Sequence, residues 1–303
     1  MKNSTNRKTA LLGTVLVLLA AACWSVIGLF VRALYAAGLG VWEITLIRIG
    51  VGLTAMAVYL LLFHRELLRI RLRDLWCFAG AGILSLLCMN FCYNQAVQLT
   101  SLALAGTLLY TAPTFVMLMS LIFFREHMTK RKLLCLLLAF AGCALVSGIA
   151  RGRLSLTPKA LLLGLGSGLS YALYSIFSRF ALDRGYNSWT ITFYSFVFCT
   201  LGCAVFAHPA AIAGAAAARP MLLAPMSMLG LITGFAAFVL YTNGLRFLET
   251  GRASVIASLE LVFGALVGLI AYGERVGTDA VAGIALILTA VAILSGVKKV
   301  NIK

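Results

Sequence analysis

Long apolar stretches alternate with short polar ones along the whole chain. Ten of the apolar stretches are close to the roughly 20 residues that an α-helix needs to cross a bilayer. They are predicted at 10–34, 39–62, 75–97, 101–123, 131–149, 160–182, 188–207, 223–247, 250–272 and 279–297, numbered spans 1 to 10 below. The longest connection, from His208 to Met221, is rich in alanine and is expected to hold a short interfacial helix. The pattern predicts an all-α integral membrane protein with ten transmembrane helices.

The composition excludes a water-soluble domain. Apolar residues make up 62% of the 303 residues, charged residues only 11%, and the mean hydropathy is +1.02. A soluble domain carries about 25% charged residues. The eight cysteines lie in apolar stretches without CxxC spacing, so they are interpreted as packing residues. The sequence has no HExxH, P-loop or GxSxG motif, so we expect neither a cofactor nor a metal nor an enzymatic activity.

The basic residues indicate the orientation of the chain. Of the 25 Lys and Arg residues, 18 fall on the side of the N-terminus, six on the other side, and Arg48 lies inside span 2. The positive-inside rule then predicts a multi-pass protein of the plasma membrane with both termini in the cytoplasm. The net charge of +16 is explained by this orientation and by contact with anionic lipids, so no nucleic acid partner is expected.

The chain repeats weakly at a spacing near 148 residues. The segment 144–148 (ALVSG) matches 292–296 (AILSG), and 42–45 (WEIT) resembles 189–192 (WTIT). Each half holds five predicted spans, and because five is odd, the halves enter the membrane in opposite directions. The prediction is therefore two inverted five-helix repeats, at 1–150 and 151–303, an architecture typical of secondary transporters.

Both halves contain residues whose order and spacing form a motif. In the first half they are Trp24, Ser25, Arg48, Tyr93, Ala96, Thr100, Ala103, Pro113 and Glu126, and in the second Tyr241, Gly244, Leu245, Ala253, Ser258, Leu259, Glu260, Glu274 and Gly283. Over essentially its whole length the chain resembles the ten-span EamA-type family of the drug/metabolite transporter superfamily. The resemblance implies a cavity lined by spans 1–4 and 6–9. It also implies peripheral spans 5 and 10 that could pair in a homodimer.

One departure from the family pattern concerns span 9. The family often has proline after the glutamate of this span, and the chain has Leu261 there. The sequence therefore leaves open whether span 9 bends as span 4 is expected to do at Pro113.

Two ionisable residues lie inside predicted spans, where a charge is costly and is by default a sign of function. Glu260 is expected to contact a cationic group of a substrate or to carry a proton; alternatively it only holds helices together. Arg48 is expected to bind a substrate carboxylate or to balance Glu260; alternatively it extends toward the interface or pairs with Glu43. The sequence does not decide between these alternatives.

Aromatic and polar side chains form stripes at helical spacing on several spans. The candidate substrate-binding residues, besides Arg48 and Glu260, are Trp24, Asn90, Tyr110, Tyr171, Tyr174, Tyr194, Tyr241 and Asn243. Such rings can hold a cation or stack on an aromatic molecule. Hydrogen bonding between helices is the alternative, which requires no ligand.

Two further glutamates, Glu126 and Glu274, lie at span ends beside Arg125 and Arg275. They are predicted to act in gating or orientation through ion pairs. The alternative is that both are solvated charges at the membrane interface.

These patterns predict a secondary transporter of small organic metabolites that works by alternating access. We expect an exporter of amino acids, amines or drug-like compounds, with protons as a possible coupling ion and the lipid bilayer as its surroundings. The alternative, an integral-membrane enzyme acting on lipid-linked substrates, would require polar residues clustered at one membrane surface. A purely structural membrane protein is the third class, which the buried charges disfavour.

Overall fold

The computed structural model describes residues 2–100, 102–146, 157–273 and 277–295, and this part is helical with connecting turns and contains no strand. Seven helical stretches are long and apolar enough to cross a membrane: 9–36, 41–63, 72–99, 104–124, 158–183, 220–244 and 250–272. Three of them are single or nearly continuous helices, namely α1 (Lys2–Ser25) with α2 (Ile27–Ala36), α3 (Val41–Phe63) and α9 (Pro158–Asp183). The predicted all-α integral membrane fold is confirmed.

The remaining predicted spans coincide with shorter helices. These are α8 (Lys130–Val146), α10 (Ser188–Cys203) and α16 (Thr278–Ser295). The predicted short helix in the longest connection is α11 (Pro209–Ala218), which begins at a proline whose missing N–H is not needed there. A helix therefore occupies every predicted span, and the crossing of the membrane by all ten stays a prediction.

Spans 4 and 9 are interrupted at equivalent places. Span 4 consists of α6 (Leu102–Leu109) and α7 (Ala112–Phe124), and span 9 of α14 (Thr250–Ala257) and α15 (Leu259–Tyr272). The break at Tyr110 and the break at Ser258 are separated by the repeat spacing of 148 residues. Pro113 explains the first break, because its nitrogen cannot bond the preceding turn. The second break forms without a proline, which answers the question that Leu261 left open.

Spans 3 and 8 each contain a π-helical segment in the middle. Span 3 runs through α4 (Leu75–Ala79), the π-helix η3 (Gly80–Leu87) and α5 (Cys88–Leu99), and span 8 through α12 (Leu223–Met228), η6 (Leu229–Ala236) and α13 (Ala237–Gly244). η3 packs against α10 and η6 against α3, so each π-helix contacts a span of the other half. Short π-helical segments are rare and occur frequently at functional sites.

Glycines make the close packing of these π-helices possible. A Cβ added at Gly82 would lie 2.5 Å from the carbonyl oxygen of Ser195, and one at Gly234 would lie 2.6 Å from that of Arg48. Only a residue without a side chain allows the backbones to approach this closely. The two halves are thus joined tightly where spans 2 and 8 and spans 3 and 7 cross.

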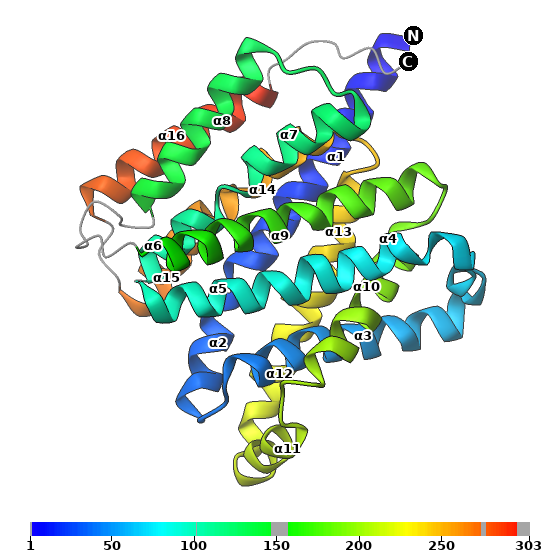
Figure 1. Ribbon diagram of the computed structural model, residues 1–303, viewed down its shortest axis with the longest axis vertical. Helices are drawn as coiled ribbons and strands as arrows, with labels where there is room; N and C mark the ends of the chain where they lie inside the picture. Colours follow the sequence, from blue (N-terminus) through cyan, green and yellow to red (C-terminus); the bar gives the residue numbers. More distant parts are fainter. Residues whose placement is uncertain (1, 101, 147–156, 274–276, 296–303) are drawn as a thin grey trace.

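Helices α8 and α16 lie side by side at the edge of the molecule (Figure 1). They touch through Gly142 and Gly283, where an added Cβ would come within 2.7 Å of the opposite carbonyl oxygen. Leucines of α8 and α16 on the outer faces, such as Leu137 and Leu288, are exposed. Spans 5 and 10 are therefore peripheral, as the resemblance implies, and their pairing in a homodimer stays a prediction.

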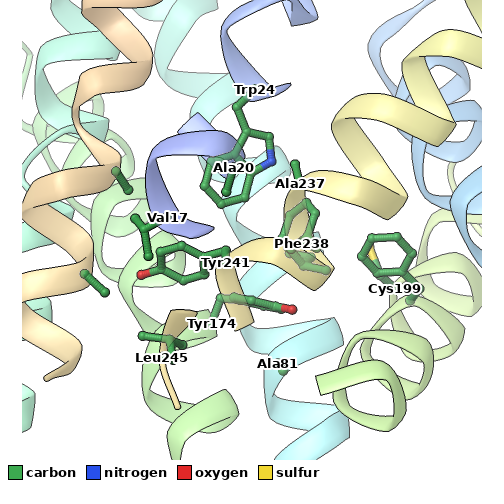
Figure 2. Packing of buried hydrophobic residues seen from close by; sticks show 14 of the residues in the cluster. Val17, Ala20, Trp24, Ala81, Tyr174, Cys199, Ala237, Phe238, Tyr241 and Leu245 are labelled. Carbon is green, nitrogen blue, oxygen red and sulfur yellow. The ribbon is translucent and has the colours of Figure 1, made fainter. Parts of the chain in front are cut away.

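The largest buried cluster joins the two halves near the middle of the bundle. Figure 2 shows Trp24 of α1 beside Phe238 of α13, with Tyr241 and Tyr174 next to them. The rings of Trp24 and Phe238 meet edge to face at 5.3 Å between centroids, and Trp24 is only 7% exposed. This aromatic cluster forms one wall of the candidate site.

Candidate functional site

A cavity of about 610 Å³ lies between the two halves. Its volume falls within the roughly 300–1,000 Å³ that is usual for small-molecule sites. The lining residues come from both repeats: Trp24, Ser25, Ile27, Gly28, Arg48, Leu86, Met89, Asn90, Tyr93, Leu109, Tyr110, Val146, Tyr171, Phe238, Glu260, Leu261, Gly264, Ala265, Gly277 and Ala280. The lining extends to Gly277 and Ala280, at the start of α16.

Glu260 is held by tyrosines in this cavity. Its carboxyl group accepts a hydrogen bond from the hydroxyl of Tyr110, at the break in span 4, and it also interacts with the hydroxyl of Tyr171 on α9. Tyr110 belongs to the first half and Glu260 to the second. The contact therefore joins the two interrupted spans at the centre of the molecule.

Arg48 lines the same cavity without a carboxylate partner. Within the described residues no ion pair or hydrogen bond is formed by its guanidinium, and its Nε atom is buried without a partner. The local alternative, Glu43, is engaged elsewhere, because it accepts a hydrogen bond from the backbone N–H of His208 at 2.9 Å and contacts the His208 ring. The pairing of Arg48 with Glu43 is therefore not formed.

Trp24 and Asn90 complete the predicted residues that the cavity brings together. The Asn90 amide accepts a hydrogen bond from Thr45 at 3.3 Å and donates one to the carbonyl of Leu86 at 2.7 Å. In total the cavity unites Trp24, Arg48, Asn90, Tyr110, Tyr171 and Glu260. Whether these residues bind a substrate stays a prediction.

Several lining residues were not predicted as site residues. Met89, Tyr93 and Phe238 add apolar and aromatic surface, and Gly264 and Ala265 open space beside Glu260. Tyr93 is part of the motif of the first half, and Gly264 lies on the same helical face as Glu260, so the sequence contained an indication that both line the site. Met89 and Phe238 carried none, because an apolar residue in an apolar span does not stand out.

Tyr241 and Tyr174 lie outside the main cavity. Tyr241 lines a narrow space of about 20 Å³ that shares Tyr110 and Tyr171 with the cavity, and its hydroxyl is hydrogen-bonded to Ser175 at 2.7 Å. The Tyr174 hydroxyl is buried and hydrogen-bonded to Thr242 at 3.0 Å. Such a space holds about one water molecule, so the cavity narrows sharply here.

Tyr194 and Asn243 lie still nearer to the side of the N-terminus. Tyr194 donates a hydrogen bond at 2.7 Å to the carbonyl of Leu68, in the 3-10 turn η1 (Arg65–Leu68). The amide oxygen of Asn243 accepts one from Ser188 at 2.6 Å. The structure therefore gives these two residues contacts between helices and loops, away from the cavity.

Glu126 contacts the start of a helix in the other half. Its carboxylate accepts hydrogen bonds from the backbone N–H groups of Thr250 at 2.8 Å and Gly251 at 3.4 Å, at the N-terminus of α14. A carboxylate is favoured there by both the free N–H groups and the helix dipole. The partner is thus a helix N-terminus instead of the predicted ion pair. Glu274 lies outside the described residues.

Two more polar contacts lie on the same side. Lys132 of α8 forms an ion pair with Glu249 at 2.6 Å. The guanidinium of Arg179 donates hydrogen bonds to the carbonyls of Leu245 at 3.0 Å and Leu248 at 3.2 Å. The Arg179 contacts lie within the second half. The Lys132–Glu249 pair and the Glu126 contact, together called the N-side seal here, join the two halves where the cavity does not reach.

A cavity with buried charged and polar groups between two related halves of an all-α membrane bundle is the architecture typical of secondary transporters. The model of the EamA-like transporter family matches the chain twice, over residues 11–148 and 158–296. The chain therefore belongs to this family of membrane transporters.

Relatives agree with this membership, and a solved structure shares the fold. An uncharacterized transporter of Archaeoglobus fulgidus is 31% identical over 66% of this chain and 70% of its own length. The uncharacterized transporter YxxF of Bacillus subtilis is 27% identical over 66% of this chain, which spans 63% of that relative's length. A solved structure, titled only as a crystal structure of a protein, has a TM-score of 0.75 at 19% identity, covering 93% of this chain and 95% of that one. This last likeness shows the fold alone.

Proposed function

We propose that the protein is a secondary transporter that exports a small organic metabolite, such as an amino acid, an amine or a drug-like compound, by alternating access. The observation that carries this proposal is the cavity between the halves, which contains Arg48 and Glu260 and is shut off on one side only. The polar lining lies in the middle of the spans, whereas an enzyme for lipid-linked substrates would need it at one membrane surface.

The one-sided closure of the cavity supports the assignment of this structure to one of the two states that alternating access requires. The lining reaches Gly277 and Ala280 at the start of α16, while the Tyr241 contact and the N-side seal lie on the opposite side. If the side of the N-terminus is the cytoplasm of a plasma membrane, as the basic residues predict, this state faces outward. Rocking of one half against the other would break the N-side seal and expose the cavity to the cytoplasm.

Glu260 is the residue that we propose for proton coupling. A carboxyl group in this position can exist with or without its proton, and Tyr110 and Tyr171 can stabilise it by hydrogen bonding. Binding of a cationic group beside protonated Glu260 would favour the ionised carboxylate and so release the proton of Glu260 into the cavity. Transport of that cation would then respond to a pH gradient.

The test is counterflow in proteoliposomes made from the purified protein. Vesicles preloaded with a high concentration of one unlabelled amino acid or amine are diluted into a trace of the same labelled compound. We expect transient accumulation of at least one compound without ATP, and its loss in Glu260→Gln. Glu66→Gln is the matched control that should retain counterflow, because Glu66 is exposed and its carboxylate contacts His64 far from the cavity. A panel in which every compound behaves as in empty liposomes would contradict the proposed function.

A further inference from the structure

Arg48 presents an electrostatic problem that the chain itself does not solve. Its guanidinium keeps its charge under all ordinary conditions. It lies inside span 2, its Nε is buried without a partner, and its remaining surface faces the cavity. A buried polar group without a partner destabilises the folded protein, and this holds for the Nε atom of Arg48. Such an arrangement persists when the missing partner is a ligand.

The acidic residue on the same helix as Arg48, Glu43, and the acidic residue of the cavity lining, Glu260, both have other partners. Glu43, five residues away on α3, is bound to the backbone and ring of His208. Glu260 is bound by Tyr110 and Tyr171 and forms no ion pair with Arg48 among the described residues, and the two opposite charges attract each other only across the cavity. Four other carboxylates belong to contacts on the side of the N-terminus: Asp74 with Arg71, Glu126 with α14, Asp183 with Arg179, and Glu249 with Lys132.

The surroundings of Arg48 suit an organic anion with an apolar body. Trp24, Tyr93 and Phe238 give the same cavity an aromatic wall, and Asn90 adds a polar amide near Thr45, one helical turn from Arg48. The planar guanidinium can bind a carboxylate through two parallel hydrogen bonds. The cavity volume of about 610 Å³ is large enough for such a molecule.

We propose that Arg48 binds the anionic group, foremost a carboxylate, of the transported molecule, and that it selects carboxylated substrates over amines that lack this group. The inference rests on the proposed function and narrows its substrate class. It places the carboxylate at Arg48 and leaves Glu260, across the same cavity, for an ammonium group where the substrate has one.

The test uses a matched series of small probes and thermal unfolding of the purified protein. The probes are 3-phenylpropionate, 2-phenylethylamine, L-phenylalanine and phenyl phosphate, which share one ring and differ in their charged groups. The variants are Arg48→Met, Arg48→Lys and, as a control, Arg219→Met, which removes an exposed charge on the side toward which the cavity extends. A ligand that binds only the folded state raises the unfolding temperature.

We expect the unliganded Arg48→Met protein to unfold at a higher temperature than the wild type, because an unpaired charge has been removed. We also expect 3-phenylpropionate and L-phenylalanine to stabilise both the wild type and Arg219→Met. Arg48→Lys should be stabilised weakly by these probes. Arg48→Met should not be stabilised by 3-phenylpropionate. Stabilisation by phenyl phosphate as large as that by 3-phenylpropionate would extend the site to phosphate esters.

Three results would overturn the inference. The first is a lower unfolding temperature of unliganded Arg48→Met, which would show that the guanidinium is a structural partner. The second is an equal response of Arg48→Met and wild type to 3-phenylpropionate. The third is that no carboxylated probe at millimolar concentration stabilises the wild type.

Counterflow separates this inference from the proposed function. Arg48-dependent binding of 3-phenylpropionate without counterflow of any compound would overturn the function and leave the anion site. The opposite result is counterflow of 2-phenylethylamine at the same rate in wild type and Arg48→Met, together with no counterflow of any carboxylated probe. It would overturn the anion site and leave the proposed function.

Discussion

The N-side seal makes a measurable prediction about Glu126. In the structure the Glu126 carboxylate bonds the first two N–H groups of α14, at 2.8 and 3.4 Å, and so holds span 4 against span 9. Glu126→Gln keeps the size of the side chain, retains one acceptor oxygen and removes the charge. If the halves separate here during transport, the substitution destabilises the closed seal relative to the open one.

The size of this effect follows from the two hydrogen bonds. A hydrogen bond to a charged group contributes about 1.5–3 kcal/mol and a neutral one about 0.5–1.5 kcal/mol. Because only the 2.8 Å contact is short, we expect a net loss of about 1–2 kcal/mol, which shifts the ratio of open to closed protein roughly 5- to 30-fold.

The assay is thiol labelling from the side of the N-terminus. Ser254 lines the narrow space of about 20 Å³ between the cavity and the N-side seal. Ser254→Cys therefore reports opening of the seal when the eight native cysteines have been replaced. An impermeant reagent should label this cysteine roughly 5 to 30 times faster in Glu126→Gln. The control Glu66→Gln, on the same side, should leave the rate unchanged.

The result that would refute this reasoning is an unchanged or slower labelling rate in Glu126→Gln, measured with correctly folded protein. It would mean that the contact of Glu126 with α14 is present in both states or that the seal does not open.

Two further predictions concern packing and the ion pair of the seal. Gly82→Ala should lower the unfolding free energy by about 1–3 kcal/mol, because its Cβ would lie 2.5 Å from the Ser195 carbonyl oxygen. Gly214→Ala is the control and should have little effect, because the space around Gly214 is open. Equal unfolding temperatures of the two variants would refute the close approach of η3 and α10. A double-mutant cycle of Lys132→Met and Glu249→Gln should give a coupling energy of about 0.5–1 kcal/mol, and strict additivity would show that their 2.6 Å contact does not stabilise the protein.

The breaks in spans 4 and 9 show how far the helix geometry could be predicted from the sequence. The sequence predicted the break in span 4 from Pro113, because proline removes a backbone hydrogen bond. It could not predict the break at Ser258, which has no proline and depends on the packing of the two half-helices in the other repeat. The spacing of 148 residues between Tyr110 and Ser258 links both breaks to the same repeat.

The polar stripes show the limit of helical periodicity more clearly. Span 6 carries Tyr171 and Tyr174 close together in sequence, yet Tyr171 lines the cavity and Tyr174 is bonded to Thr242. Periodicity states which side chains share a helical face, but not whether a cavity or another helix lies opposite. Tyr194 and Asn243 carried the same signal as Asn90 and contact loops and helices on the side of the N-terminus.

The sequence by itself determined the membrane class, the helices, the repeat and the two charges at the centre, Arg48 and Glu260. These follow from local properties, because the length of an apolar stretch identifies a span and because the free-energy cost of an ionisable residue inside a span marks it as a candidate for function. Only the tertiary structure decided that Glu260 is bound by Tyr110, that Glu126 contacts the start of α14, and that Arg48 has no carboxylate partner in the described residues. Each of these depends on which group of the other half, or of a distant span, lies opposite, and no local pattern of the chain contains that information.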